Sequence, residues 1–397
     1  MKEAYIVAIQ RSAVCKAGRG AFAQTRPDNL LAEIIKTVMK PFAALQGEID
    51  DVVIGCAMQE GPQGVNMARV AALLAGLPVR TPGVTVNRLC SSGLQSIAYA
   101  AERIQLGLSE IVVAGGAESM SLVPFTPERF AFNPCLFDGR HQEDLGIAYG
   151  MGLTAEVVAK RYQVSREDQD RFALESHVRA IEAIKKGWFK AEICPIEVTQ
   201  RLADLTTEVV NKKIITVSQD EGPRADTHFE ALQKLMPAFA QNGGVTAGNS
   251  SQISDGAGAL LVVSEAVLKR HNLTPLARFC GFAVEGVEPA EMGIGPVQAI
   301  PKVLKQVKLK QDDMDWIELN EAFAAQSVAV IRQLGLDPAK VNPQGGAIAL
   351  GHPLGATGTL RTATLIHGLK RIHGRYGMVS MCIGVGMGAA AVFEVLS

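Results

Sequence analysis

A Gly-x-Gly-Ala pattern followed by an apolar strand occurs twice in the chain, and it constrains the possible folds more than any other feature. Residues 256–264 read GAGALLVVS, and residues 386–393 read GMGAAAVF. A second pair of matching segments precedes them: residues 84–87 (VTVN) lead to Cys90, and residues 341–343 (VNP) lead to His352. The spacing favours a duplicated chain with two similar halves, although the common composition of apolar strands would give the same letters by coincidence.

Short apolar runs alternate with helical stretches through the first 120 residues. Residues 51–55 (DVVIG) and 110–116 (EIVVAGG) are predicted to be buried strands that end in glycine. Residues 94–106 are predicted to form a helix of small residues. Such alternation is typical of an α/β layered fold.

The chain changes character between about residues 121 and 245, where charged amphipathic stretches replace the apolar runs. Ser165 and Asp168 form a capping box that predicts the start of a helix, and Gly187 predicts its end. We therefore divide the chain into residues 1–120 plus 246–272 as an N-terminal half, 121–245 as an insertion and 273–397 as a C-terminal half. Aromatic residues between Leu122 and Phe137 suit a core, a membrane-facing surface or a subunit contact equally well.

Composition excludes several classes of protein. The formal net charge is −1 and no long lysine or arginine run is present, so nucleic-acid binding lacks an electrostatic basis. No apolar run is long enough to span a bilayer, so we expect no integral membrane association. The seven cysteines are scattered without a Cys-x-x-Cys pair, which argues against disulfides and a zinc site. Without a secretory leader or a peroxisomal address at residues 394–397, the expected location is the cytoplasm.

Cys90 lies where a β-branched run ends, a turn follows and a helix begins. A thiol at a helix N-terminus faces free N–H groups and the positive end of the helix dipole, which favour the thiolate. These residues alone leave two interpretations open, a reactive cysteine and a buried structural one.

His352 lies between glycines in residues 345–358 (GGAIALGHPLGATG), just before a helix predicted to start near Thr357. The glycines allow the backbone to approach another group closely. No lysine follows the last glycine, as a Walker A phosphate loop would require. A loop histidine that is merely hydrogen-bonded is the alternative interpretation.

Cys382 ends an apolar strand and enters the glycine-rich turn 384–388 (GVGMG). The turn matches a loose dinucleotide-binding pattern, but no helix or acidic ribose partner follows it before Ser397. A backbone N–H aimed at an oxyanion is the better use of these glycines. Asn320, in residues 317–324 (IELNEAFA), lies between a strand and a helix and is either an N-cap or a ligand for a water or an oxyanion.

These four sites all follow the C-terminal ends of predicted strands, where α/β sheets place their ligands. Two cysteines and a histidine without metal spacing suit thioester chemistry. One thiolate attacks a carbonyl while a neutral base accepts its proton, and the second thiol acts as acid and base.

With these motifs in this order, the sequence strongly resembles the thiolases. The resemblance rests on residues 87–93 (NRLCSSG), 246–251 (TAGNSS), 320–324 (NEAFA), 351–358 (GHPLGATG) and 382–388 (CIGVGMG), and it covers nearly the whole chain. It implies an α/β thiolase fold in which two similar βαβαβαββ-type halves form an α/β/α/β/α layered core with an inserted loop domain. It also implies an acyltransferase that takes acyl-CoA and coenzyme A as substrates, with no tightly bound cofactor and no metal.

The resemblance implies a role for each matching residue. Cys90 takes the acyl group, and His352 activates Cys90 and holds the thioester oxygen together with a water on Asn320. Cys382 moves a proton at the α-carbon of acetyl-CoA, and the N–H groups of Cys90 and Gly384 form a second oxyanion hole. The residues expected along coenzyme A and its pantetheine arm are Ser251, Arg224, Ala247, Phe239, Met151, Ala322 and Phe323. For Phe239 and Phe323, packing in the core is the alternative.

One segment departs from a branch of this family. Acetoacetyl-CoA thiolases carry a histidine in a Tyr-His-Met-Gly segment, and residues 149–152 (YGMG) place Gly150 there. Loss of the imidazole removes a polar wall, so the resemblance favours a degradative 3-ketoacyl-CoA thiolase of fatty-acid β-oxidation.

Other functions remain as alternatives. They are an acetoacetyl-CoA thiolase and a non-catalytic acyl-CoA- or lipid-binding protein on the same fold. A malonyl-condensing ketoacyl synthase is disfavoured because those enzymes generally use histidine where Cys382 stands. The resemblance further implies a homodimer or homotetramer, with a β-oxidation complex as a possible partner.

Overall fold

A computed structural model describes residues 2–124, 132–137, 146–204, 206 and 209–396. Its strands are β1 (Ala4–Arg11), β2 (Cys15–Lys16), β3 (Asp51–Gly55), β4 (Val84–Val86), β5 (Ile111–Ser119), β6 (Ile196–Asp204), β7 (Val209–Val217), β8 (Ser254–Ser264), β9 (Ala277–Gly286), β10 (Trp316–Leu319), β11 (Tyr376–Ile383) and β12 (Met387–Val395). Its α-helices are α1 (Pro27–Met39), α2 (Met67–Leu74), α3 (Ser92–Gln105), α4 (Met151–Arg161), α5 (Arg166–Lys185), α6 (Phe229–Gln233), α7 (Glu265–His271), α8 (Gly295–Val307), α9 (Ala324–Leu334), α10 (Ala347–Leu350) and α11 (Thr357–Ile372).

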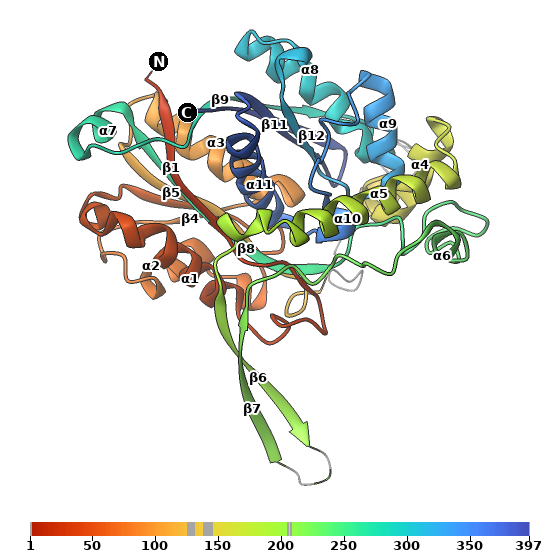
Figure 1. Cartoon of the computed structure of the whole chain (residues 1–397), viewed down its shortest axis with the longest axis horizontal. Coiled ribbons are helices and arrows are strands. Elements are labelled where there is room, and N and C mark those ends of the chain that lie inside the picture. The colour runs from red at the N-terminus through yellow and green to blue at the C-terminus, as the bar shows by residue number, and fades with distance from the viewer. Residues whose placement is uncertain (1, 125–131, 138–145, 205, 207–208, 397) are drawn as a thin grey trace.

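The main sheet contains one strand arrangement twice (Figure 1). In the N-terminal half, β4, β3 and β5 are parallel neighbours, and β8 and then β1 follow, each antiparallel to its neighbour. In the C-terminal half, Val341 forms a parallel bridge to β10, β10 is parallel to β11, and β12 and then β9 follow antiparallel. The two Gly-x-Gly-Ala segments therefore lie on β8 and at the start of β12, at equivalent places, which confirms the predicted repeat.

Helices separate and cover the two halves of the sheet. α3 and α11 pack against each other in the middle, with α3 against β3 and β5 and α11 against β10 and β11. α1 and α2 cover the outer face of the N-terminal half, and α8 and α9 cover that of the C-terminal half. The expected α/β/α/β/α order of layers is thus confirmed. The halves also join edge to edge, because Tyr5 and Ile6 of β1 pair with Arg278 and Ala277 of β9.

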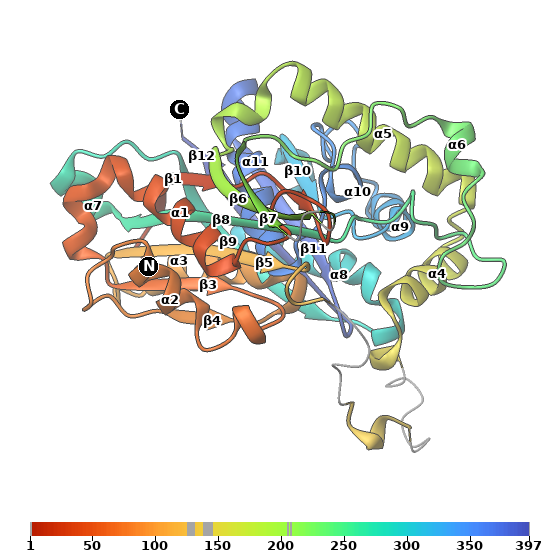
Figure 2. The same ribbon diagram turned by 90° about the horizontal axis from the view of Figure 1, so that it is seen from below.

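The helices α4, α5 and α6 of the insertion lie on one side of the core (Figure 1, Figure 2). The capping box is confirmed: Ser165 accepts from the N–H of Asp168, and Asp168 accepts from the N–H of Ser165 at 2.9 Å. Gly187 has a φ of +68°, which ends the helix as predicted. The ribbon of β6 and β7 projects away from the core (Figure 1). The boundaries of the three units stay a prediction.

The segment from Leu122 to Phe137 falls only partly within the described residues, since 125–131 lie outside them. Of its aromatic residues, Phe137 is exposed. Among the described parts of the chain, no helix has the length and apolar character needed to cross a membrane.

Candidate active site

Cys90 lies in a short 3-10 turn, Leu89–Ser91, between β4 and α3, and it is half-buried. Leu89 has a φ of +46°, a left-handed conformation that is strained for a leucine and makes the turn sharp. Asn87 supports the turn, since its Oδ1 accepts from Leu89 N at 2.8 Å and its Nδ2 donates to Ala57 O at 2.9 Å. The turn lies against the second half of the chain, next to Gly384.

The backbone N–H groups of Gly384 and of Cys90 itself are the two donors that favour the Cys90 thiolate. Burial raises the pKa of Cys90 to about 11, while these two N–H groups lower it and the charge of Glu118 raises it further. The lowering expected at a helix N-terminus is therefore outweighed by burial. At neutral pH the resting sulfur is a thiol, and it needs a base to become a nucleophile.

The Cys90 turn and the His352 loop meet where α3 and α11 begin. A Cβ at Gly93 would lie 2.7 Å from Gly355 O, and one at Gly358 would lie 2.3 Å from Leu94 N. Only glycine permits backbones to approach this closely. The two glycines therefore bring together segments that belong to different halves of the chain.

His352 is 5% exposed, and both of its ring nitrogens have neighbours. Nδ1 lies 2.7 Å from Thr357 Oγ1, and Nε2 lies 3.4 Å from Asn320 Nδ2. With the amide as donor, Nε2 is the unprotonated nitrogen and Nδ1–H donates to Thr357. Burial, and secondly the charge of Arg361, lower the pKa of His352 to about 4. The ring is therefore neutral at pH 7 and able to accept a proton.

Asn320 lies directly after β10 and is fully buried. The N-cap interpretation is wrong, because α9 begins at Ala324 and its N-cap residue is Phe323. The side chain of Asn320 instead turns its Nδ2 to His352, and its Oδ1 has no hydrogen-bond partner among the described residues. A buried carbonyl oxygen without a donor is costly, so this oxygen is suited to hold a water or a donor group of a ligand.

Cys382 lies in β11 and is 1% exposed. Burial, and secondly repulsion from Cys90, raise the pKa of Cys382. The chain just after Cys382 lies against the Cys90 turn, since a Cβ at Gly384 would be 3.1 Å from Leu89 Cδ1. The next turn has φ values of +60° at Val385 and +86° at Gly386. The fold thus brings the end of β11 and its following turn to the Cys90 turn, and the catalytic roles of these residues stay a prediction.

The residues expected along coenzyme A fall into two groups. Met151, Ala322 and Phe323 share an apolar cluster with Cys382. Phe239 packs edge-on against Phe323 with ring centroids 6.0 Å apart, and Ser251 N donates to Ala322 O at 3.0 Å. Phe239 is 44% exposed, so core packing does not describe it, whereas Phe323 is buried in the cluster.

Ala247 and Arg224 form the second group, and both are exposed. The Arg224 side chain pairs with Asp226 at 3.0 Å, and its backbone N–H donates to His177 Nδ1 at 3.2 Å. These contacts place Arg224 beside α5 and not in the cluster around Cys382. The described residues include no group of three or more His, Cys, Asp or Glu side chains arranged to hold a metal ion.

Glu118, at the end of β5, is a residue of the site that sequence reasoning missed. It is 1% exposed and accepts hydrogen bonds from the N–H groups of Ala57 at 2.8 Å and Gly355 at 2.9 Å, and from Gln63 Nε2 at 2.7 Å. Burial raises the pKa of Glu118, and these donors lower it. The carboxyl ties the His352 loop to the first half. A single acidic residue near the end of an otherwise uncharged strand was the available signal.

Comparisons with known proteins agree with this geometry. The family described as "Thiolase, N-terminal domain" matches residues 4–266, and "Thiolase, C-terminal domain" matches residues 273–395. The chain belongs to the thiolase family. Cys90 lies in the first of these matches, and Asn320, His352 and Cys382 lie in the second, so the candidate site draws on both. The chain is accordingly an acyltransferase, of a family that acts on coenzyme A thioesters.

Several relatives are similar to this thiolase over nearly its whole length. A protein of Bacillus subtilis named 3-ketoacyl-CoA thiolase is 52% identical over 394 residues, 99% of this chain and 100% of its own. The human "3-ketoacyl-CoA thiolase, peroxisomal" is 46% identical over 97% of this chain and 89% of its own. The crystal structure of a Bacillus anthracis acetyl-CoA acetyltransferase superimposes with a TM-score of 0.89 at 40% identity, covering 100% of this chain and 99% of the other.

Proposed function

We propose that this protein is a 3-ketoacyl-CoA thiolase. It cleaves 3-ketoacyl-CoA with coenzyme A to give acetyl-CoA and a shortened acyl-CoA, through an acyl group on Cys90. The observation that carries the proposal is geometric: the Cys90 turn and the His352 loop meet at the glycine contacts between α3 and α11, and His352 Nε2 lies 3.4 Å from Asn320 Nδ2. The relatives named 3-ketoacyl-CoA thiolase, at 45–52% identity, support the same activity.

In the first half-reaction His352 accepts the thiol proton of Cys90, and the sulfur attacks the 3-keto carbon. The Cα–Cβ bond then breaks, and Cys382 gives its proton to the carbanion of the departing acetyl-CoA. The raised pKa of Cys382, caused first by burial, keeps it protonated until this step. The low pKa of His352, about 4, keeps its ring ready to accept.

In the second half-reaction coenzyme A gives its thiol proton to the Cys382 thiolate and takes the acyl group from Cys90. His352 returns its proton to Cys90, so the site ends as it began. The two oxyanion sites, Asn320 through a water with His352, and the N–H groups of Cys90 and Gly384, stabilise charge that develops only in the transition states.

The two groups of residues expected along coenzyme A are assigned to different parts of that molecule. We assign the pantetheine arm to Met151, Phe239, Ser251 and the pair Ala322–Phe323, because these surround or adjoin Cys382. Ala247 and the exposed guanidinium of Arg224 are assigned to the outer part of the coenzyme. A homodimer or homotetramer, a β-oxidation partner and a cytoplasmic location belong to the same proposal, since the family implies them.

Acyl chain length is assigned from Gly150, which directly precedes α4. A Cβ built there meets no described atom within 4 Å, so this position leaves space beside Met151. A longer acyl chain is accommodated more easily by such space than by an imidazole. The similarity to an acetyl-CoA acetyltransferase structure favours acetoacetyl-CoA thiolase as the second candidate.

A thiolysis panel from acetoacetyl-CoA to long-chain 3-ketoacyl-CoA separates the two candidates. We expect kcat/KM for six-carbon and longer substrates to equal or exceed that for acetoacetyl-CoA. Gly150→His should lower the long-chain values by about tenfold or more, whereas Gly150→Ala, which adds one methyl to open space, should leave them within about twofold. Activity confined to acetoacetyl-CoA in the parent protein would establish the second candidate instead.

A further inference from the structure

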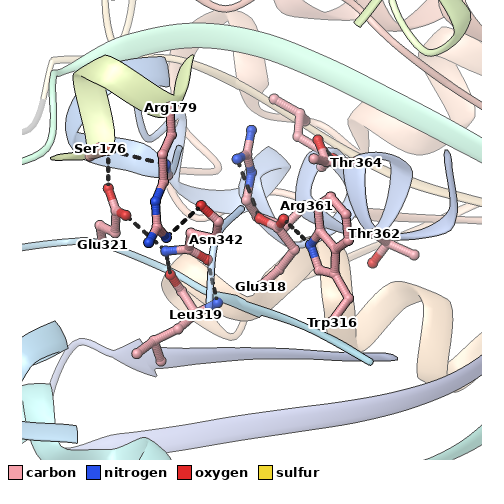
Figure 3. Close-up of polar contacts among 12 residues, drawn as sticks. Ser176, Arg179, Trp316, Glu318, Leu319, Glu321, Asn342, Arg361, Thr362 and Thr364 are labelled. Carbon is pink, nitrogen blue, oxygen red and sulfur yellow. Dashed lines mark hydrogen bonds and ion pairs between the residues drawn. The ribbon is translucent and has the colours of Figure 1, made fainter. Parts of the chain in front are cut away.

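A buried hydrogen-bond network holds Leu319 and Glu321, the two residues that flank Asn320 in the chain (Figure 3). Asn342 pairs with the backbone of Leu319: its Oδ1 accepts from Leu319 N and its Nδ2 donates to Leu319 O, each at 2.8 Å. The same Nδ2 donates to Glu321 Oε1 at 2.8 Å. One side chain therefore holds both residues that flank Asn320.

Glu321 extends the network to two further segments. It is 1% exposed, and its Oε2 accepts from Ser176 Oγ at 2.7 Å and from Ile348 N at 3.1 Å. Ser176 belongs to α5 of the insertion, and its Oγ also accepts from Gly346 N at 3.1 Å. Residues 346–348 lead through α10 to His352. The carboxyl thus connects the Asn320 junction, the approach to His352 and the insertion.

The chemistry of Glu321 points beyond simple packing. Burial raises the pKa of Glu321, and the Ser176, Asn342 and Ile348 donors lower it. A buried carboxyl is a poor way to gain stability, because an apolar side chain of the same volume would avoid the cost of desolvation. A fully hydrogen-bonded polar group instead specifies one arrangement of the segments around it. A Cβ at position 346 would lie 2.2 Å from its carboxyl carbon, so the fit leaves no freedom.

Asn320 needs such support because its own side chain is weakly held. Its Nδ2 makes one long contact, 3.4 Å, to His352, and its Oδ1 is among the buried atoms without a partner in the described chain. The orientation of the amide must therefore come from the backbone on either side. The backbone of Asn320 itself is held by Ser380, whose O accepts from its N–H at 2.9 Å, and by Gln326, whose Nε2 donates to its O at 3.2 Å. Asn342 and the carboxyl of Glu321 hold the residues on either side.

We propose that Glu321, Asn342 and Ser176 are positioning residues. They hold the side-chain amide of Asn320 in the position where it contacts His352. They act through Asn320 and His352 and touch no substrate. The inference rests on the proposed function, because it takes Asn320 and His352 to act in thiolysis. It adds that the insertion, through Ser176, is a part of the catalytic arrangement as well as a surface for coenzyme A.

The test uses two conservative variants, Glu321→Gln and Ser176→Ala. Glutamine keeps the shape of Glu321 but turns an N–H₂ group towards a donor, either Asn342 Nδ2 or Ile348 N. We expect kcat for thiolysis to fall about tenfold to a hundredfold in Glu321→Gln, since a small misplacement at a reacting centre has that effect. Ser176→Ala should show a smaller fall. KM for coenzyme A should stay within about threefold for both.

Ser165→Ala is the matched control, because it removes the N-cap of the same helix far from the site. It should lower the melting temperature by as much as Ser176→Ala does, with an unchanged kcat. The proposal is overturned if Ser176→Ala and Ser165→Ala show the same kcat at the same loss of melting temperature. It is also overturned if both network variants, Glu321→Gln and Ser176→Ala, keep the parental kcat. If Glu321→Gln does not fold, Ser176→Ala alone decides between these results.

A second readout uses no acyl substrate. The rate at which iodoacetamide alkylates Cys90, followed from pH 5 to 10 by mass spectrometry, reports activation of the thiol by His352. Both network variants should slow this rate relative to the parent and to Ser165→Ala, and equal rates would contradict the role assigned here. A parent without thiolysis, but with alkylation slowed by Glu321→Gln, would overturn the proposed function and leave the positioning role standing.

Discussion

At the scale of single residues, burial determines the charge of the reacting side chains. It raises the pKa of Cys90 to about 11 and lowers the pKa of His352 to about 4, and it also raises the pKa of Cys382. The site at neutral pH therefore holds two thiols and a neutral imidazole. Transfer of the Cys90 proton to His352 therefore creates a thiolate and an imidazolium together, and the backbone N–H groups near Cys90 favour the thiolate.

Arg361 is the second cause of the low pKa of His352, after burial. Its guanidinium is 1% exposed and lies 3.5 Å from Glu318 (Figure 3). In Arg361→Met the pKa of His352 should rise from about 4 towards its ordinary value of 6.5. Because the reaction needs neutral His352, activity is lost as pH falls through this pKa. The acidic limb of kcat/KM should therefore move to higher pH, with little change above pH 8.

Glu318→Gln is the control for this prediction, because it breaks the same ion pair but keeps the cation. Its Oε1 can still accept from Trp316 Nε1, as Glu318 does at 2.7 Å. The acidic limb should not move upward in this variant. Identical acidic limbs for Arg361→Met and the parent protein would show that Arg361 does not act on His352.

At the scale of elements, the site is formed at the N-terminal ends of two helices. α3 begins just after Cys90 and α11 begins five residues after His352, and the two helices touch where Gly93 and Gly358 lack side chains. This explains why the motifs are rich in glycine. The backbone must come close before the reacting side chains can meet.

Gly358→Ala should disturb this contact, because its Cβ would lie 2.3 Å from Leu94 N. Overpacking of this kind costs about 1–3 kcal/mol, so we expect a loss of that size in the free energy of unfolding in urea, together with a lower kcat. Gly47→Ala is the control: a Cβ there meets nothing within 4 Å, and the change should stabilise the protein by about 0.4–1 kcal/mol. A neutral effect of Gly358→Ala would show that α3 and α11 can separate without harm.

Elements with a strong local signal were predictable from the sequence. The capping box at Ser165 and the glycine at 187 set the ends of α5 where local rules place them. Asn320 is different: a polar residue between strand and helix satisfies the N-cap rule, yet the helix starts four residues later, at Ala324. Its true partner, His352, is distant in sequence, and no local rule reveals such a contact.

The repeat organises the site at the scale of the whole molecule. One half supplies Cys90 after β4, and the other supplies Asn320, His352 and Cys382 around β10 and β11. The repeated glycine pattern was visible in the sequence and predicted two similar halves, whereas the order of the layers came from the resemblance to the thiolases. The support from Glu118 and Glu321 was not predicted, because a buried carboxyl has the same letter as an exposed one. Only the fold shows which donors surround it.

The claim that Cys90 alone carries the acyl group is tested most directly by incubating the protein with an acyl-CoA donor and mapping the modified peptide. The chain has seven cysteines, so the result is discriminating. We expect one acyl group on Cys90, none in Cys90→Ala, and retained acylation with little complete turnover in Cys382→Ser. An acyl group on another residue, or on none, would contradict the account.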